Sequence, residues 1–354
     1  MPKDMNSLLK LMIEKNASDL HISAKSPAQI RIDERLEAVD DRILSVEEVK
    51  SLIYSILTKQ QIDKFERDLE LDISFEITDY SRFRINIFKQ RGAVGASIRL
   101  IPYKIWTFEE CGLPANVAVS LCKRPKGLVL VTGATGSGKS TSLASMVDWI
   151  NNDRPCHIIT IEDPIEFVHQ NKKALIDQRE VYSDTHTFPA ALKHVLRQDP
   201  DVILIGEMRD LETIESALII AETGHLVFAT LHTSDCVQTV NRIVDVFPYH
   251  QQQQIRTQLS FVLLGVMAQQ LIPRQGGKGR VLASEVLLAT AAVRSLIRES
   301  KVHQIYSTMQ TSQKEGMKTM NQSLYELYQK KAISYEDAIS RSTDPDDLMR
   351  LFKR

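Results

Sequence analysis

Residues 133–140 combine glycines, a lysine and a serine in the spacing of a phosphate-binding loop. The segment reads Gly133-Ala134-Thr135-Gly136-Ser137-Gly138-Lys139-Ser140, which matches G-x-x-x-x-G-K-[ST] without a gap. Glycines adopt backbone angles that a Cβ forbids, so successive N–H groups can point at an anion. The Lys139 ammonium suits β- and γ-phosphates, and the Ser140 hydroxyl suits Mg²⁺. The loop therefore predicts a site for ATP with Mg²⁺.

The segments on either side of this loop agree with that interpretation. Residues 127–132 form an apolar run that predicts a buried strand, and residues 140–150 predict a helix. Unpaired N–H groups at the start of that helix would add positive potential at the phosphates. The predicted nucleotide-binding residues are Gly133, Thr135, Gly136, Ser137, Gly138, Lys139, Ser140 and Thr141.

A second apolar strand, predicted over residues 157–161, leads into three carboxylates. The sequence continues Glu162-Asp163-Pro164-Ile165-Glu166. In open α/β sheets, ligands bind beyond the carboxyl ends of the strands. We favour Glu162 as the general base that accepts a proton from the attacking water, because it follows the strand most closely. The alternative is that these acids cap the turn before Pro164.

A third strand, predicted over residues 202–205, is followed by Gly206 and Glu207. This is the place of the carboxylate that organises Mg²⁺ in P-loop enzymes, although the usual aspartate is replaced by Gly206. Glu207 either holds the metal, partly through water, or positions the nucleophile, and the sequence leaves both roles open. Asp210 is placed to cap the helix that follows.

A fourth strand, predicted over residues 226–231, has a histidine near each end. His232 stands at the carboxyl end, where it could sense the γ-phosphate, and His225 stands at the far end. A lone histidine is more often a structural group, so the catalytic role of His232 depends on the neighbouring strands that carry Glu162 and Glu207.

Arginines mark two adjacent strands nearer the N-terminus. Arg84 and Arg99 each lie on the polar side of an alternating pattern. They are either a solvated strand face or arginine fingers, which stabilise a transferring phosphoryl group and raise the rate about 10³–10⁵-fold. If a neighbouring subunit supplies them, hydrolysis requires assembly.

The elements that position these residues fall into two domains. Residues 1–100 alternate as antiparallel strands mixed with short helices, which predicts a small α+β domain. Residues 101–109 contain Pro102 and predict a linker or hinge. Residues 110–354 alternate apolar strands with helices, which is typical of an α/β domain with a mostly parallel sheet. Residues 250–272 and 291–352 are predicted to be mostly helical, with C-terminal helices from about residue 290.

Composition excludes several other classes of protein. The 354 residues have a net charge of −1, which argues against a strongly basic nucleic-acid binder. The four cysteines form no C-x-x-C pair, so neither a zinc ribbon nor a disulfide framework is indicated, and a reducing cytoplasm fits. No apolar run approaches 18 residues and no N-terminal signal segment is evident, so direct membrane insertion is not expected.

Taken together, the motifs resemble those of the secretion and pilus assembly ATPases. Walker A, the acidic segment 162–166, the Walker B variant Gly206-Glu207-Met208-Arg209-Asp210 and the histidine segment from Gly224-His225 to His232 occur in that family's order. Ala17-Ser18-Asp19-Leu20-His21 is similar to its N-terminal domain. Residues 292–299, Ala-Val-Arg-Ser-Leu-Ile-Arg-Glu, and residues 316–324 look like those of the type IV pilus retraction ATPases.

This resemblance implies a PAS-like N-terminal domain, a RecA-like P-loop ATPase domain and a homohexameric ring. ATP would sit between the domains, with Arg84 and Arg99 reaching in. The ring would work in the cytoplasm, at the inner-membrane base of the pilus, against a platform protein, and a related accessory retraction ATPase is a possible partner. The resemblance also implies that the segment around Arg294 serves retraction rather than ATP turnover.

Other functions remain open on the sequence alone. A pilus extension or type II secretion ATPase shares the fold, although this chain lacks the four-cysteine zinc motif and extra N-terminal domains of the extension type. A nucleic-acid translocase or a nucleotide-gated scaffold is a further alternative, since fold does not determine function.

Overall fold

The computed structural model describes residues 4–15, 17–32, 35–77, 81–101, 104–277 and 279–353. The chain divides into two compact units, Met1–Lys104 and Ile105–Arg354. Pro102 and Tyr103 of the predicted hinge lie outside the described residues, so the hinge over residues 101–109 stays a prediction.

The first unit contains a six-stranded antiparallel sheet in the order β3-β2-β1-β6-β5-β4. Its strands are β1 (Asp19–Ile22), β2 (Gln29–Ile32), β3 (Arg35–Ala38), β4 (Glu70–Ile77), β5 (Ser81–Gln90) and β6 (Ala93–Ile101). Its helices are α1 (Met5–Glu14), α2 (Val46–Tyr54) and α3 (Lys59–Asp68). Alternating side chains such as Phe83, Ile85 and Ile87 are fully buried, so the other face of β5 carries its polar residues.

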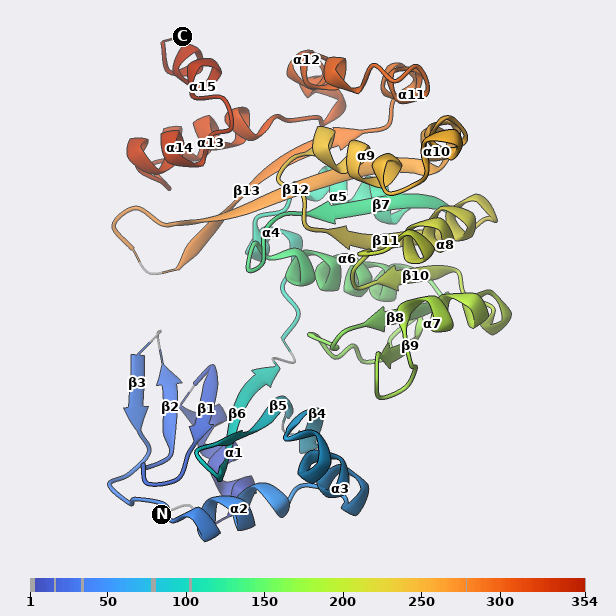
Figure 1. The fold of residues 1–354 in the computed structure, drawn as a ribbon. Coiled ribbons are helices and arrows are strands. Elements are labelled where there is room, and N and C mark those ends of the chain that lie inside the picture. The colour runs from blue at the N-terminus through green and yellow to red at the C-terminus, as the bar shows by residue number, and fades with distance from the viewer. Residues whose placement is uncertain are drawn as a thin grey trace. The chain divides into compact units, whose positions relative to one another are not determined.

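The second unit is built on a seven-stranded sheet in the order β13-β12-β7-β11-β10-β8-β9 (Figure 1). All neighbours are parallel except β12 and β13, which are antiparallel. The strands are β7 (Gly127–Thr132), β8 (His157–Glu162), β9 (Leu175–Glu180), β10 (Val202–Ile205), β11 (Leu226–Leu231), β12 (Leu263–Pro273) and β13 (Arg280–Leu288). The predictions of an α/β fold with a mostly parallel sheet and of an N-terminal antiparallel-sheet domain are confirmed.

Helices cover both faces of this sheet. One face packs against α4 (Phe108–Cys111), α5 (Ala115–Cys122) and α6 (Lys139–Asp153). The other packs against α7 (Phe188–Val195), α8 (Leu211–Glu222), α9 (Cys236–Asp245), α10 (Tyr249–Val262), α11 (Ala291–Arg298) and α12 (Ile305–Thr311). Burial on both faces explains why β7, β10 and β11 are apolar at almost every position.

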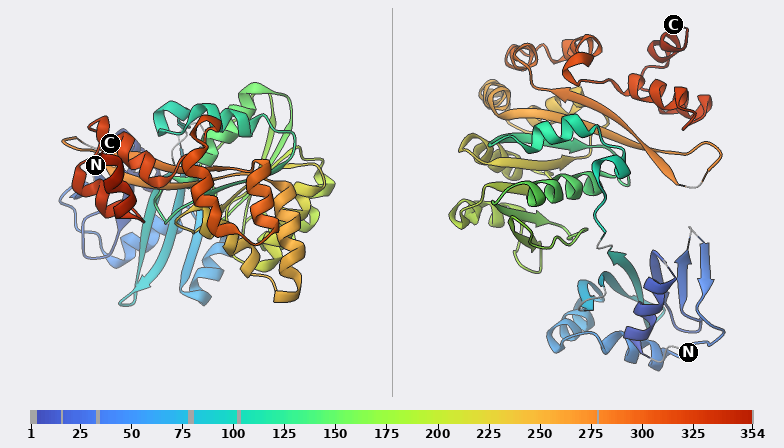
Figure 2. Two further views of the ribbon diagram at one scale, coloured as in Figure 1. Left: turned by 90° about the horizontal axis from the view of Figure 1, so that it is seen from above. Right: turned by 180° about the vertical axis from the view of Figure 1, so that it is seen from behind.

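A third group of helices packs against the C-terminal part of β12 and the N-terminal part of β13, around Ile272 and Ala283 (Figure 2). These helices are α13 (Met320–Gln329), α14 (Tyr335–Arg341) and α15 (Pro345–Phe352). Elsewhere in this unit, three short 3₁₀ turns are described: η1 (Leu196–Gln198), η2 (Val302–Gln304) and η3 (Gln313–Glu315). The prediction of helix over residues 250–272 is wrong after Val262, where the chain enters β12. Among the described residues, no helix is long and apolar enough to cross a membrane.

Candidate active site

The predicted phosphate loop connects the end of β7 to the start of α6. Gly133, Gly136 and Gly138 have φ values of +141°, +78° and +90°. A Cβ on Gly133 would meet the Gln269 carbonyl at 2.5 Å, so this position needs glycine for space as well as for its backbone angle. Gly138 caps α6 without a side-chain hydrogen bond. The first N–H groups of α6 are therefore available to an anion.

Lys139, the first residue of α6, folds back onto the loop. Its Nζ donates to the carbonyls of Gly133, at 2.9 Å, and of Ala134, at 3.1 Å. Partial burial lowers the pKa of Lys139, and the carboxylates of Glu207 and Glu166 oppose that shift. A triphosphate would offer this ammonium stronger, charged acceptors than two neutral carbonyls.

Three hydroxyl residues of the same motif bear on how a nucleotide and its metal would fit. Ser137 is buried, and its Oγ has no hydrogen-bond partner among the described residues. An unpaired buried hydroxyl is costly, so a bound phosphate oxygen would satisfy a group that the folded chain leaves open. Ser140 follows in the first turn of α6, and Thr135 lies exposed on the loop.

Glu162 ends β8 and is held by two donors on one oxygen. Its Oε1 accepts from the Thr160 hydroxyl at 2.6 Å and from Nε2 of Gln178 at 3.2 Å. Burial raises the pKa of Glu162 to about 7, although both of these hydrogen bonds and one from the backbone of Glu166 act in the opposite direction. A carboxylate with a pKa near neutrality is suited to accept and release a proton at physiological pH.

Glu207, just beyond β10, is held from two sides. Arg209 forms two hydrogen bonds to its carboxylate, at 2.7 and 2.8 Å, and Nε2 of His232 lies 3.2 Å from its Oε1. Partial burial raises the pKa of Glu207, but the hydrogen bonds and charges of Arg209 and His232 outweigh it and lower that pKa. The carboxylate therefore stays ionised. The structure brings His232 and Glu207 together, as their positions after adjacent strands suggested.

A small cavity connects the phosphate loop to the two acidic strand ends. It has a volume of about 30 Å³ and is lined in part by Ser140, Glu162, Gly206 and Thr230. This volume is enough for about one or two water molecules. Gly206 lies at the crossing of these elements, where a Cβ would stand 3.1 Å from Cα of Glu162. A side chain there would crowd β8, which accounts for glycine at the position where an aspartate was expected.

The protein alone offers no complete metal cage in the part of the chain that is described. No group of three or more histidine, cysteine, aspartate or glutamate side chains there is arranged to hold a metal ion. Mg²⁺ commonly takes only one or two protein ligands and completes its shell with water and substrate phosphates. Ser140 and Glu207 fit that pattern, because they lie on the loop and on the strand that flank the nucleotide position.

Arg84 and Arg99 lie in the first unit, on β5 and β6. Nε of Arg84 lies 3.9 Å from Asp72, and Nε of Arg99 lies 2.9 Å from Asp19. The two guanidinium side chains are 45% and 69% exposed, so they are accessible to a charged partner. Their role as arginine fingers stays a prediction.

Two residues of this site carried no recognisable signal in the sequence. Gln178 stands in a polar strand at the sheet edge, and Arg209 was noted only as part of the segment after Glu207. Asp210 does cap α8 as expected, since its carboxylate accepts from the backbone N–H of Thr213 at 2.8 Å. His225 lies at the other end of β11, where its ring contacts the carbonyl of Ile220 at 3.2 Å.

Comparison with known proteins connects this geometry to a family. A family model described as "Type II/IV secretion system protein" matches residues 1–338. The type IV pilus retractation ATPase PilT of Pseudomonas aeruginosa is 49% identical over 97% of this chain and 99% of its own length. A twitching motility protein of Neisseria gonorrhoeae is 45% identical over 97% of this chain and 92% of its own length.

A solved structure extends the likeness to three dimensions. The crystal structure of the pilus retraction motor PilT with bound ADP superposes with a TM-score of 0.93, at 49% identity, over 99% of this chain and 100% of that one. The likeness thus spans both units as well as the phosphate loop, and it confirms the resemblance that the four sequence motifs indicated.

Proposed function

Because the chain belongs to the family of Type II/IV secretion system proteins and is an ATP hydrolase of that family, we propose that it is a motor that retracts type IV pili. The observation that supports this most strongly is the end-to-end likeness to a retraction motor that holds ADP. The geometry of the phosphate loop and of the carboxylates beyond β8 and β10 independently supports the ATP hydrolysis that such a motor requires.

In this proposal the loop binds the triphosphate and α6 directs its N–H groups at it. Lys139 leaves the carbonyls of Gly133 and Ala134 for phosphate oxygens, and Ser137 gains the partner that it lacks. Thr141 follows in the first turn of α6 and is included among the binding residues. Bound Mg²⁺ would neutralise phosphate charge, held by Ser140 and, partly through water, by Glu207.

Hydrolysis then depends on residues that hold or move protons and charge. Glu162 accepts a proton from the attacking water, because its pKa of about 7 leaves it partly ionised at neutral pH. His232 reports the presence of the γ-phosphate through its contact with Glu207. Arg84 and Arg99 stabilise the charge of the transferring phosphoryl group.

The proposal includes an assembly and a location. The chain forms a homohexamer in which Arg84 and Arg99 of one copy serve the nucleotide of a neighbour. The ring is cytoplasmic and peripheral, at the inner-membrane base of the pilus machine, and acts on the platform protein there, with a related accessory retraction ATPase as a further partner. No nucleic acid takes part.

Deletion of the gene, combined with ATPase assays of the purified chain, tests this function. We expect pili to accumulate on the cells and twitching to be lost, with rescue by the wild-type chain but not by Lys139→Ala. Cells that lack pili altogether would instead favour an extension or secretion role. Stimulation of ATP hydrolysis by DNA would favour a translocase.

A further inference from the structure

The side-chain amide of Gln178 lies between the carboxylate of Glu162 and the segment that follows β8. Gln178 is paired with Thr160 in the parallel register of β9 and β8. Its Nε2 donates to Oε1 of Glu162 at 3.2 Å and to the Phe167 carbonyl at 2.8 Å. Its Oε1 accepts from the backbone N–H of His169 at 2.8 Å. One amide therefore touches both the carboxylate and the loop beyond it.

The two backbone partners determine which end of the amide faces Glu162. If the amide were turned over, its NH₂ group would meet the N–H of His169, and its oxygen would meet the carbonyl of Phe167. Both contacts would set like groups against each other. The NH₂ group of Gln178 must therefore point at Glu162, where it can only donate.

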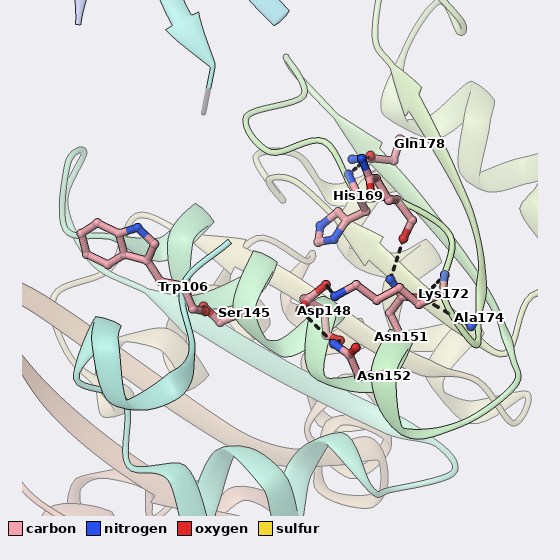
Figure 3. Close-up of polar contacts among 10 residues, drawn as sticks. Trp106, Ser145, Asp148, Asn151, Asn152, His169, Lys172, Ala174 and Gln178 are labelled. Atoms are coloured by element: carbon pink, nitrogen blue, oxygen red, sulfur yellow. Dashed lines mark hydrogen bonds and ion pairs between the residues drawn. The ribbon is translucent and has the colours of Figure 1, made fainter. Parts of the chain in front are cut away.

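The loop that holds Gln178 in this orientation is itself fastened to α6. Asn151 is fully buried, its Nδ2 donates to the Gln170 carbonyl at 2.8 Å, and its Oδ1 accepts from the N–H groups of Lys172 and Ala174 at 3.0 and 3.3 Å. Lys172 also pairs with Asp148 of α6 at 2.7 Å. Figure 3 shows Asn151 beside Lys172 and Ala174, and Gln178 of β9 beside His169. The segment is thus attached to the helix that begins at Lys139.

The donors on Glu162 decide which of its oxygens can do chemistry. Thr160 and Gln178 both donate to Oε1, and an oxygen of a carboxylate has two lone pairs. A proton taken from water then goes to Oε2, the oxygen to which neither of these side chains donates. A general base works only when its accepting atom is aimed at that water, and a misplacement of about 1 Å can cost 10²-fold in rate.

We propose that Gln178 is the positioning residue of the general base: its NH₂ group turns Glu162 so that Oε2 faces the attacking water. The inference rests on the proposed role of Glu162. Gln178 does not touch the nucleotide in this scheme, so its loss lowers kcat and leaves ATP binding intact.

The first test compares Gln178→Leu with Lys172→Met. The leucine has a similar size and donates no hydrogen bond, and we expect kcat to fall about 10–100-fold with KM for ATP changed less than about twofold. Lys172→Met removes the partly exposed ion pair with Asp148 from the same segment but leaves the Asn151 contacts, Gln178 and Glu162 in place, so its kcat should change less than about threefold. Equal losses of kcat in both variants would overturn the inference. If Gln178→Leu does not fold, Gln178→Met, which keeps the length of the side chain and also donates no hydrogen bond, takes its place.

A double-mutant cycle with Glu162→Gln distinguishes an effect of Gln178 on the position of Glu162 from a general effect on the fold. If Gln178 acts through Glu162, Gln178→Leu should cause no further loss of rate in the Glu162→Gln background. Losses that multiply would overturn the inference. Near-normal turnover in Glu162→Gln alone would instead refute the proposed role of Glu162. A slow Glu162→Gln together with a normal Gln178→Leu would refute only the inference about Gln178.

Discussion

Arg84 and Arg99 face each other across β5 and β6 as register partners, which places two guanidinium groups on the same face of the sheet. Like charges directly opposite each other destabilise a sheet. Asp72 and Asp19 each lie within 4 Å of one of the two arginines and offset part of that repulsion. An exposed pair of like charges does not stabilise the unit, but it can bind a polyanionic ligand.

Arg84→Ala should abolish ATP turnover while ATP binding is retained, because arginine fingers act on the transition state and raise the rate about 10³–10⁵-fold. Lys139→Ala should be inactive for a different reason, loss of phosphate binding. In a ring whose interfaces join two different surfaces, mixing the two inactive variants should restore about a quarter of the sites. ATP hydrolysis of the mixture, measured after the chains exchange, tests this.

A variant of a third arginine in the same unit gives the control for this mixing experiment. Arg91 lies in the turn between β5 and β6 and is exposed, so Arg91→Gln should hydrolyse ATP at the normal rate. If purified monomers of the wild-type chain turn over at the full rate, the arginines do not act between subunits. Mixed variants that stay inactive although they form mixed rings would contradict the idea in the same way.

Turnover should depend on pH through Glu162. Burial raises the pKa of this carboxyl to about 7, and a general base is active only when it is deprotonated. The kcat/KM for ATP, which reports the pKa of the free enzyme, should therefore be level above pH 8 and fall about tenfold for each pH unit below 7. Glu162→Gln should lose nearly all turnover and keep ATP binding. A wild-type profile that stays level down to pH 5 would exclude Glu162 as the base.

The sequence predicted the central part of this site because its strands are apolar on both faces. The ranges predicted for β7, β10 and β11 agree with the structure, and β8 is longer by one residue, Glu162. Parallel strands buried on both sides form continuous apolar runs, so they can be recognised without periodicity. Their order in the sheet then brings Glu162, Glu207 and His232 to one edge.

The sheet's outer strands could not be predicted in this way. β9 has the sequence Leu-Ile-Asp-Gln-Arg-Glu and lies at the edge of the sheet, so it lacks the continuous apolar run that identifies the central strands. β12 follows α10 without a break, and the apolar residues around the junction at Leu263 suit a helix as well as a strand. Gln178 was missed for the same reason as its strand, because its role depends on register with Thr160 and not on any motif.

His232 and His225, at the two ends of β11, should differ sharply on mutation. His232→Gln removes the contact with Glu207 and leaves Arg209 in place, so we expect kcat to fall about tenfold while KM changes little, as for an interaction made in the transition state. His225→Gln alters contacts with the Ile220 carbonyl and the Thr223 hydroxyl, both away from Glu207, and should leave kcat unchanged. Steady-state ATPase kinetics of both variants measure this. Equal kcat values for both variants would assign His232 a structural role.

Arg294 makes hydrogen bonds inside the fold, so its substitution should change stability as well as any role in retraction. Its guanidinium donates to the carbonyls of Ala289, Phe261 and Leu263, at 2.9, 2.7 and 2.8 Å, and to that of Ser260. Three of these carbonyls belong to the C-terminal end of α10 and the residue after it, where backbone acceptors lack helical partners. Arg294→Ala should therefore lower the free energy of unfolding by about 2–4 kcal/mol. For the unit Ile105–Arg354 that corresponds to a fall in Tm of roughly 4–8 °C, measurable by thermal denaturation.

Failed retraction in Arg294→Ala would then have two explanations, and Arg298 separates them. Arg298 lies four residues on, with only a 3.4 Å hydrogen bond to the Ser260 hydroxyl and the ring of Phe261 6.0 Å away. Arg298→Ala should change the free energy of unfolding by less than about 1 kcal/mol. If the segment 292–299 serves retraction directly, Arg298→Ala should lose twitching with normal ATPase activity and normal Tm. Normal twitching in Arg298→Ala, with loss only in a destabilised Arg294→Ala, would show that the segment acts by closing the fold around α10.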